Sequence, residues 1–287
     1  MCRLFGMSGG PERVAATFWL LEAPDSLAEQ SRREPDGTGL GSFTEDGRPV
    51  VSKQPLAAYE DEAFAREAKE VRSHTFVAHV RYASTGGLTP ENTHPFEQAG
   101  RLFAHNGVIE DLERLDTELG DARELVKGET DSERYFALIT KETQRTGDVQ
   151  DGIERATNWI ADNLPVFALN FVLIAPTELW AFRYPDTHPL YVLEREAGGP
   201  NGHRHLEHAS ARGSIRVRSG DMAGCRAVVV ATEPMDEDPG WRNLGSGDLV
   251  HVDEDLNVDV TAVLKRPPER QLTLADLGGK AAESQRP

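Results

Sequence analysis

The chain has 287 residues, of which 38% are hydrophobic and 28% charged, proportions that are ordinary for a soluble globular protein. Its net charge of −17 argues against nucleic acid or an anionic membrane surface as a partner, because both attract positive charge. The sequence contains no apolar run long enough to span a membrane and does not begin like a signal peptide, so we expect a cytoplasmic protein. With two cysteines, Cys2 and Cys225, neither a disulfide framework nor a cysteine-based zinc site is expected.

The first half of the chain mixes helices and strands. An irregular polar stretch over residues 82–98 interrupts them, and such stretches inside a domain are usually functional. A short strand at 102–104 then leads to His105-Asn106-Gly107, which has the composition of a tight turn. The patterns predict strands at 2–8, 40–43 and 75–80, and helices at 12–22, 60–72, 131–143 and 152–163.

The second half is mostly strands. A loop rich in Gly, His and Arg lies at 194–213, and the polar residues 263–287 predict a flexible C-terminal tail after a domain that spans 2–262. This distribution of elements favours a layered α+β domain over a doubly wound parallel sheet. Further strands are predicted at 166–174, 179–183, 190–193, 227–231 and 248–252.

Cys2 is the first candidate for chemistry. Removal of Met1 would give it a free α-amino group, which can act as general base for the neighbouring thiol. The alternative is a small apolar residue in an edge strand.

Arg81 ends a strand that is predicted to be buried and is followed by hydroxyl side chains such as Ser84. Its planar guanidinium group suits a carboxylate, although an ion pair that anchors a loop would explain it equally well.

Two later motifs carry further donors and acids. Asn106 and Gly107 offer a side-chain amide and an unhindered backbone N–H, which together can stabilise an oxyanion, or they form an ordinary Asn-Gly turn. Asp131 lies at a helix start, where it either caps the helix or binds a substrate ammonium group.

These motifs resemble the class II glutamine amidotransferases of the N-terminal nucleophile (Ntn) hydrolase superfamily, specifically their compact stand-alone branch. The resemblance covers residues 2–180 strongly and continues more weakly to about residue 260. It rests on M-C-R-L-F-G at the start, P-D-G-T-G at 35–39, H-V-R-Y-A-S-T-G at 79–86, E-N-T-H-P-F at 91–96, A-H-N-G at 104–107 and G-E-T-D-S-E at 128–133.

The resemblance implies a four-layer αββα sandwich of two antiparallel sheets. It also implies that Cys2 is the nucleophile, that Asn106 and Gly107 form the oxyanion hole, and that Arg81 and Ser84 bind the α-carboxylate of the substrate. Asp131 would bind the substrate α-ammonium, and His94 would support the site from its loop. Thr38 departs from the family pattern, since relatives often carry tryptophan there, and Tyr82 replaces the tryptophan that is common after the arginine in the synthase branch.

The expected reaction is hydrolysis of the γ-amide of glutamine or of a γ-glutamyl conjugate through a thioester on Cys2, without a metal or another cofactor. Two alternatives remain: a glutaminase subunit that feeds ammonia to a separate synthetase, and a non-catalytic glutamine-sensing module. The sequence contains no phosphate-binding loop for a synthetase reaction of its own. His203, His205 and His208 lie close together in the sequence, but they do not complete a clear ligand set, and a metal site is not expected there.

The segment 231–241 resembles the A-[ST]-E-P…D-D-x-G-W segment of the ergothioneine-pathway amidohydrolases, which cleave a γ-glutamyl amide from a hercynyl-cysteine sulfoxide conjugate. By that likeness Thr232 and Glu233 would line a pocket for the leaving amine, and the alternative is a structural loop. The start of the chain and the 79–86 motif differ from that subfamily, so the leaving amine is not assigned. Cys225 is expected to be a structural thiol.

Overall fold

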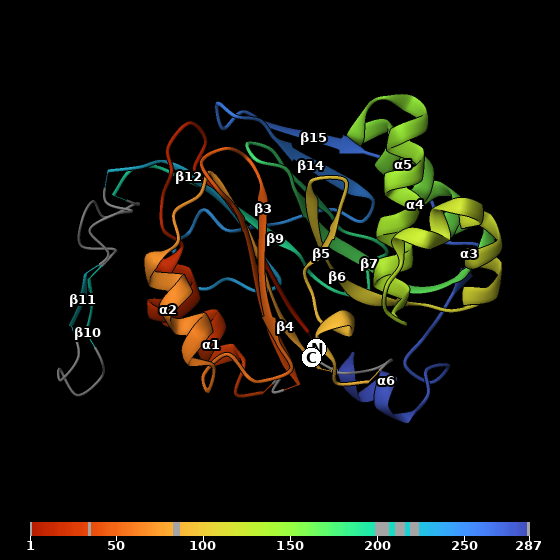
Figure 1. Cartoon of the computed structure of the whole chain (residues 1–287), viewed down its shortest axis with the longest axis horizontal. Coiled ribbons are helices and arrows are strands. Elements are labelled where there is room, and N and C mark those ends of the chain that lie inside the picture. Colours follow the sequence, from red (N-terminus) through yellow and green to blue (C-terminus); the bar gives the residue numbers. More distant parts are fainter. Residues whose placement is uncertain are drawn as a thin grey trace.

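The computed structural model describes residues 2–33, 36–82, 87–198, 207–209, 216–218 and 224–285. Two seven-stranded sheets are stacked face to face, and helices cover both outer faces (Figure 1). The predicted α+β fold and its four-layer αββα arrangement are therefore confirmed. No helix within the described residues is long and apolar enough to cross a membrane.

The first sheet is antiparallel throughout and has β1 near its centre. All six residues of β1 are buried, because the second sheet lies on one side of the strand and helices lie on the other. In spatial order its strands are β13 (Arg242–Asn243), β9 (Tyr191–Arg195), β12 (Ala227–Ala231), β1 (Arg3–Ser8), β4 (Thr75–Arg81), β2 (Gly37–Phe43) and β3 (Pro49–Gln54).

The second sheet is antiparallel except for one short strand, β16, which pairs in parallel with the start of β7. In spatial order it contains β15 (Val258–Ala262), β14 (Asp248–Val252), β8 (Leu179–Phe182), β7 (Pro165–Ile174), β6 (Arg101–Ile109) and β5 (Phe96–Gln98), with β16 (Arg270–Gln271) beside β7. A separate two-stranded ribbon joins β10 (Glu207–Ala209) to β11 (Arg216–Arg218).

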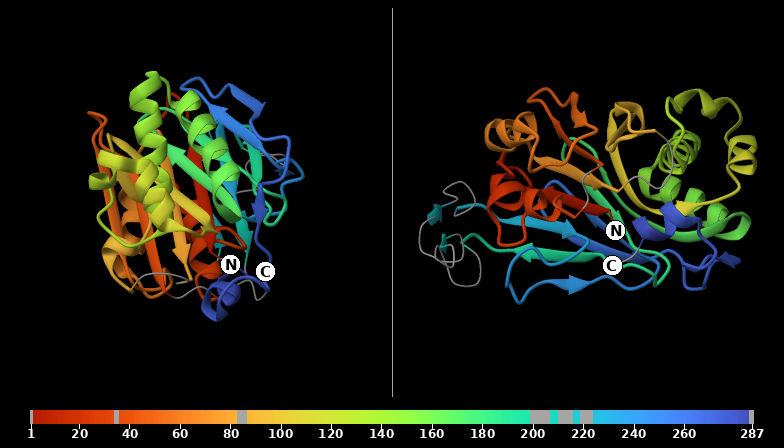
Figure 2. Two further views of the ribbon diagram at one scale, coloured as in Figure 1. Left: turned by 90° about the vertical axis from the view of Figure 1, so that its right-hand side faces the viewer. Right: turned by 90° about the horizontal axis from the view of Figure 1, so that it is seen from below.

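The two helical layers cover different sheets (Figure 2). The layer over the first sheet consists of the π-helix η1 (Phe18–Glu22), α1 (Leu27–Gln30) and α2 (Glu62–Glu70). The layer over the second sheet consists of α3 (Leu112–Leu119), α4 (Asp131–Thr146) and α5 (Val149–Asn163). Short helices η2 (Pro90–Asn92), η3 (Gly120–Leu125) and α6 (Gly279–Ser284) complete the fold.

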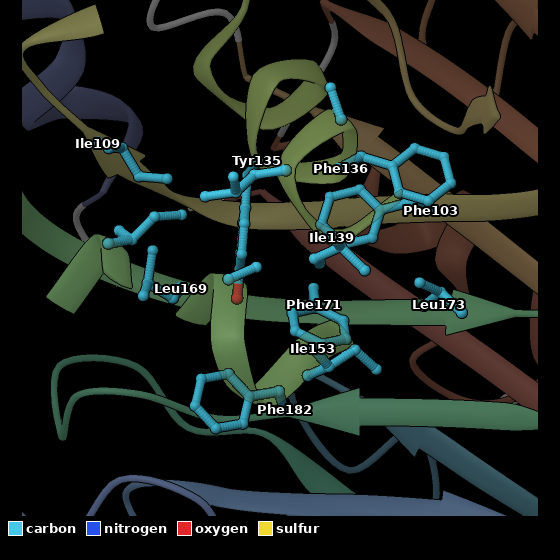
Figure 3. Packing of buried hydrophobic residues seen from close by; sticks show 14 of the residues in the cluster. Phe103, Ile109, Tyr135, Phe136, Ile139, Ile153, Leu169, Phe171, Leu173 and Phe182 are labelled. Atoms are coloured by element: carbon cyan, nitrogen blue, oxygen red, sulfur yellow. The ribbon is translucent and has the colours of Figure 1, made fainter. Parts of the chain in front are cut away.

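Helix α4 is anchored at both ends. The Thr130 side chain accepts the N–H of Glu133 at its start, and Gly147 ends it with φ = 80°, a conformation that glycine adopts without strain. Its buried face packs Tyr135 and Phe136 against Phe103 of β6 (Figure 3). The start of α4 is therefore held at a fixed height above the second sheet.

Between the sheets lies a third apolar cluster, to which β1 contributes Leu4 and β7 contributes Val172. The sheets approach closely there, since a Cβ on Gly6 would lie 2.7 Å from a Val172 methyl carbon. This close packing fixes the distance between side chains that project from the two sheets.

Three segments differ from the sequence-based expectations. Only residues 18–22 of the predicted helix at 12–22 are helical, because Val14 instead forms a β-bridge with Ser73. The turn expected at 105–107 is wrong, because β6 continues through these residues to Ile109. Residues 263–285, expected to form a flexible tail, contain β16 and α6 and bury Leu277 and Gln285.

Candidate active site

Cys2 lies immediately before β1 and is 8% exposed. Its sulfur accepts the backbone N–H of Tyr82 at 3.3 Å and lies 3.5 Å from the carbonyl oxygen of the same residue. A donor directed at the sulfur favours a negative charge there. The thiol is therefore positioned by the backbone next to Arg81, as a nucleophile requires.

Arg81 is brought to Cys2 by the pairing of β1 with β4. Arg3 pairs with Val80, so continuing this antiparallel register places Cys2 opposite Arg81. Arg81 is 4% exposed and donates from Nη1 to the carbonyl oxygen of Gly87 at 3.2 Å. Burial lowers the pKa of Arg81, whereas Cys2, Asp36 and Asp131 raise it, and a guanidinium group stays charged throughout the physiological range.

Asn106 and Gly107 reach the site from the other sheet, within β6. The Asn106 side chain donates from Nδ2 to the carbonyl oxygen of Cys2 at 2.9 Å, and this nitrogen carries a second hydrogen for another acceptor. A Cβ on Gly107 would lie 1.9 Å from the carbonyl oxygen of Ala168, so only glycine fits this register with β7. The pair of donors is thus held in a strand rather than in a turn.

Asp131 is the first residue of α4 and is 6% exposed. It accepts the backbone N–H of Ile109 at one carboxylate oxygen and that of Ser132 at the other, each at 2.9 Å. These bonds fix the carboxylate between the helix start and the end of β6. Each oxygen has a further lone pair for a cationic partner.

Five of the predicted residues line one small cavity of about 20 Å³: Cys2, Arg81, His94, Gly107 and Asp131. Asn106 adjoins it through the hydrogen bond to Cys2. Ser84, expected at the carboxylate clamp, lies outside the described residues, as do His203 and His205. No group of side chains that could hold a metal ion occurs in the part of the chain that the structure describes.

Three histidines form one wall of the cavity: His79, His94 and His105. The rings of His79 and His94 lie 4.2 Å apart between centroids, and neither ring makes a hydrogen bond of ordinary geometry with a described residue. Burial, followed by the charges of Arg81 and His105, lowers the pKa of His79 to about 3, against a small opposing effect of the His105 backbone. Burial also lowers the pKa of His94 well below its usual value and reduces that of His105. All three rings are therefore neutral at pH 7.

Several lining residues were not singled out from the sequence. His79 and Ser132 lie inside motifs that had been recognised, and Ser132 bonds His105 at 2.9 Å. Gly39 of the P-D-G-T-G motif lets the His94 loop approach, since a Cβ there would lie 1.9 Å from the His94 carbonyl oxygen. Gln285 also lines the cavity, and no pattern in the sequence points to it.

The segment around Thr232 and Glu233 lies beside the start of β1. Glu233 pairs with Arg3 at 2.8 Å and with Arg33 at 3.4 Å, and the backbone N–H of Thr232 donates to the Leu4 carbonyl oxygen at 3.2 Å. These contacts hold the segment against β1, which directly follows Cys2. Cys225 is half-buried and packs against the cluster under η1 and α2, as a structural thiol would.

The fold is similar to that of solved amidotransferase structures. The chain superimposes on a glutamine phosphoribosylpyrophosphate amidotransferase from B. subtilis with a TM-score of 0.63 and 19% identity, covering 93% of this chain and 50% of that one. A glutamine aminotransferase class-II domain protein from Silicibacter pomeroyi gives a TM-score of 0.60 at 18% identity, covering 91% of this chain and 99% of that one. The chain thus spans half the length of the B. subtilis enzyme. These similarities show that the fold is that of the Ntn-hydrolase amidotransferases.

Sequence comparison shows the family to which the chain belongs. Residues 1–275 match the family of class II glutamine amidotransferases, and the chain belongs to that family. It is 30% identical to a γ-glutamyl-hercynylcysteine sulfoxide hydrolase of Mycolicibacterium smegmatis, over 91% of this chain and 99% of that protein. It is 25% identical to a putative glutamine amidotransferase of Haemophilus influenzae, over 87% of this chain and 83% of that protein.

Proposed function

We propose that the protein hydrolyses the γ-amide of glutamine or of a γ-glutamyl conjugate, with Cys2 as the nucleophile. The observation that carries this proposal is the cavity that Cys2, Arg81, Gly107 and Asp131 line together. A thiol, a guanidinium group, a backbone amide and a carboxylate match the reactive carbon, α-carboxylate, oxyanion and α-ammonium of a γ-glutamyl substrate.

The reaction begins with attack of the Cys2 thiolate on the δ-carbonyl carbon. The backbone N–H of Gly107 and the second N–H of Asn106 Nδ2 stabilise the oxyanion that forms. The C–N bond then breaks, and the leaving nitrogen takes a proton from the α-amino group of Cys2, which requires prior removal of Met1. Water hydrolyses the γ-glutamyl thioester and releases glutamate and the free thiol.

Arg81 and Asp131 select the γ-glutamyl group. Both side chains are buried, so pairing with the substrate α-carboxylate and α-ammonium takes place away from bulk water, where charge-assisted hydrogen bonds are strong. In this proposal Ser84 completes the carboxylate clamp, and His94 supports the site from its own loop.

Two further roles remain open. The released ammonia would serve a separate synthetase subunit if such a partner binds the protein. A purely sensing role would retain binding without turnover. The meeting of Cys2, Arg81, Gly107 and Asp131 in one cavity favours catalysis over sensing.

The decisive test compares Cys2→Ala with wild type and with Cys225→Ala as matched control. Alanine is also small enough for Met1 removal, so only the thiol is lost. We expect wild type and the control to release glutamate from glutamine or a γ-glutamyl amide, and the Cys2 variant to release none. Mass spectrometry should show that Met1 is absent and that a glutamine-analogue electrophile labels Cys2. Turnover by the Cys2 variant would refute the mechanism, and binding without turnover by wild type would support the sensing role.

A further inference from the structure

Asn92 lies in the E-N-T-H-P-F motif at 91–96, and the mechanism proposed above gives it no role. It is the last residue of the short helix η2 and is 3% exposed. A buried amide needs hydrogen-bond partners for its oxygen and its nitrogen, because burial of an unbonded polar group is costly. The partners of Asn92 lie on two different segments, each of which leads to a residue of the candidate site.

The nitrogen of the Asn92 amide bonds the carbonyl group that orients Arg81. Nδ2 of Asn92 donates to the Gly87 carbonyl oxygen at 3.3 Å, and Nη1 of Arg81 donates to the same oxygen at 3.2 Å. The backbone N–H of Thr89 also donates to it, at 3.0 Å, but this bond is local. Asn92 therefore ties the carbonyl that holds the guanidinium group to a more distant part of the chain.

The oxygen of the same amide bonds the segment that leads into α4. Oδ1 of Asn92 accepts the backbone N–H of Glu129 at 2.9 Å, and Nδ2 donates to the Glu129 carboxylate at 3.3 Å. A Cβ on Gly128 would lie 2.6 Å from Oδ1 of Asn92, so this segment packs directly on the amide. Asp131 begins α4 two residues after Glu129.

One side chain thus connects the two proposed clamps. The connection runs from Arg81 through the Gly87 carbonyl, the Asn92 amide and the Glu129 N–H to the start of α4, where Asp131 lies. The α-carboxylate and α-ammonium of an amino acid share one carbon atom, so the distance between them is fixed. Two clamps bind both groups at once only if their own spacing matches that distance, and a preorganised spacing lowers the cost of binding.

We infer that Asn92 is a positioning residue that fixes the spacing of Arg81 and Asp131, so that the two clamps bind an α-amino acid together. This inference rests on the proposed γ-glutamyl hydrolysis and names the residue that couples its clamps. Asn92 is not among the described residues that line the cavity, so it acts on substrate binding and not on the chemical step.

Steady-state kinetics with glutamine compares wild type with Asn92→Ala, Asn92→Asp and Asn158→Ala in the full chain. Asn92→Asp is the milder change, because it keeps the oxygen that accepts the Glu129 N–H and loses the donor to Gly87. Asn158 is the matched control, because its amide bonds a carbonyl group within α5. Both Asn92 variants should raise KM about five- to tenfold, as expected for the loss of hydrogen bonds of ordinary strength, and change kcat by less than about twofold.

The control should keep the wild-type KM. A KM that stays unchanged in both Asn92 variants, or an effect confined to kcat, would overturn the inference.

Protection of Cys2 against iodoacetamide gives a second readout, which does not depend on turnover. It is measured in a Cys225→Ser background with L-glutamate, which carries both groups that the clamps bind, and with glutarate, which lacks the α-ammonium group. The glutamate concentration that halves the alkylation rate should rise in Asn92→Ala by the same factor as KM. The glutarate concentration should rise less, because a ligand that uses one clamp does not depend on the spacing of two. Equal shifts for the two ligands would show that Asn92 does not couple the clamps.

The outcomes separate this inference from the proposed function. Protection of wild type by glutamate without turnover would refute the hydrolysis, while the shifts in the Asn92 variants still decide the role of Asn92. Failure of glutamate to protect wild type would refute both, because the clamps would then bind no amino acid.

Discussion

The buried histidines make folding of this protein sensitive to acid. An unfolded histidine has a pKa near 6.5, whereas burial lowers the pKa of His79 to about 3 and that of His188 to about 4. Below pH 6.5 the unfolded chain therefore binds protons that the folded chain excludes, so the free energy of unfolding falls as the pH falls. The contribution is fully present above pH 6.5 and is lost progressively toward the folded pKa values.

The loss in free energy of unfolding can be calculated from these two pKa shifts. One pKa unit corresponds to about 1.4 kcal/mol, so each ring removes about 2 kcal/mol between pH 6.5 and pH 5. The two together remove about 4 kcal/mol, a large part of the roughly 5–15 kcal/mol that stabilises a typical domain. His94 and His105 shift in the same direction and add to the loss.

Urea unfolding followed by tryptophan fluorescence at pH 7, 6 and 5 measures the effect. Acidification also relieves repulsion in a chain of net charge −17, so the informative quantity is the difference between wild type and His79→Phe. Phenylalanine retains ring packing against His94 without a titrating group. The wild-type free energy of unfolding should fall more steeply, by up to about 1.4 kcal/mol per pH unit. Equal slopes in the two proteins would refute the assignment of His79 as a buried neutral ring.

Three substitutions test the proposed site. Asn106→Ala should lower kcat about 100- to 1,000-fold in steady-state assays, because one oxyanion donor is lost, and an unchanged kcat would remove Asn106 from that role. Arg81→Lys should mainly raise KM, because a single ammonium group cannot bind a carboxylate through two parallel hydrogen bonds; an effect confined to kcat would contradict the clamp. Gly107→Ala should abolish turnover and lower the thermal midpoint, because its Cβ would lie 1.9 Å from the Ala168 carbonyl oxygen, and wild-type activity would show that this contact relaxes freely.

Most strands and the main helices could be predicted from the sequence, because hydrophobic patterning and capping are local signals. The segment 105–107 shows where local signals fail. Asn-Gly is typical of a tight turn, but here the glycine is required by the close approach of β7 to β6. The preference of this dipeptide for turns is overridden by sheet pairing, which local sequence does not encode.

The prediction of a flexible C-terminal tail is wrong for a related reason. Residues 263–285 are polar and rich in glycine and proline, a composition that predicts a flexible tail. A few small apolar contacts around Leu277 and the pairing of β16 with β7 suffice to dock it, because the surface that it covers is already formed by the second sheet. The position of Gln285 follows from that docking and has no local sequence signal.

The arrangement of the candidate site explains why its motifs lie so far apart along the chain. Cys2, the proposed nucleophile, and Arg81 come from the first sheet, whereas the proposed oxyanion donors come from the second sheet and the Asp131 carboxylate from the helix above it. No pair of these elements makes the site alone, so its geometry depends on how tightly the sheets pack. Gly6 permits this close packing, since a Cβ there would lie 2.7 Å from a methyl carbon of Val172. Gly41 does the same, since its Cβ would lie 2.9 Å from a methyl carbon of Leu102. These glycines lie away from the cavity, yet a side chain at either would press on the opposite sheet and move Cys2 relative to Gly107. Packing between the sheets is thus a condition of the chemistry as well as of the fold.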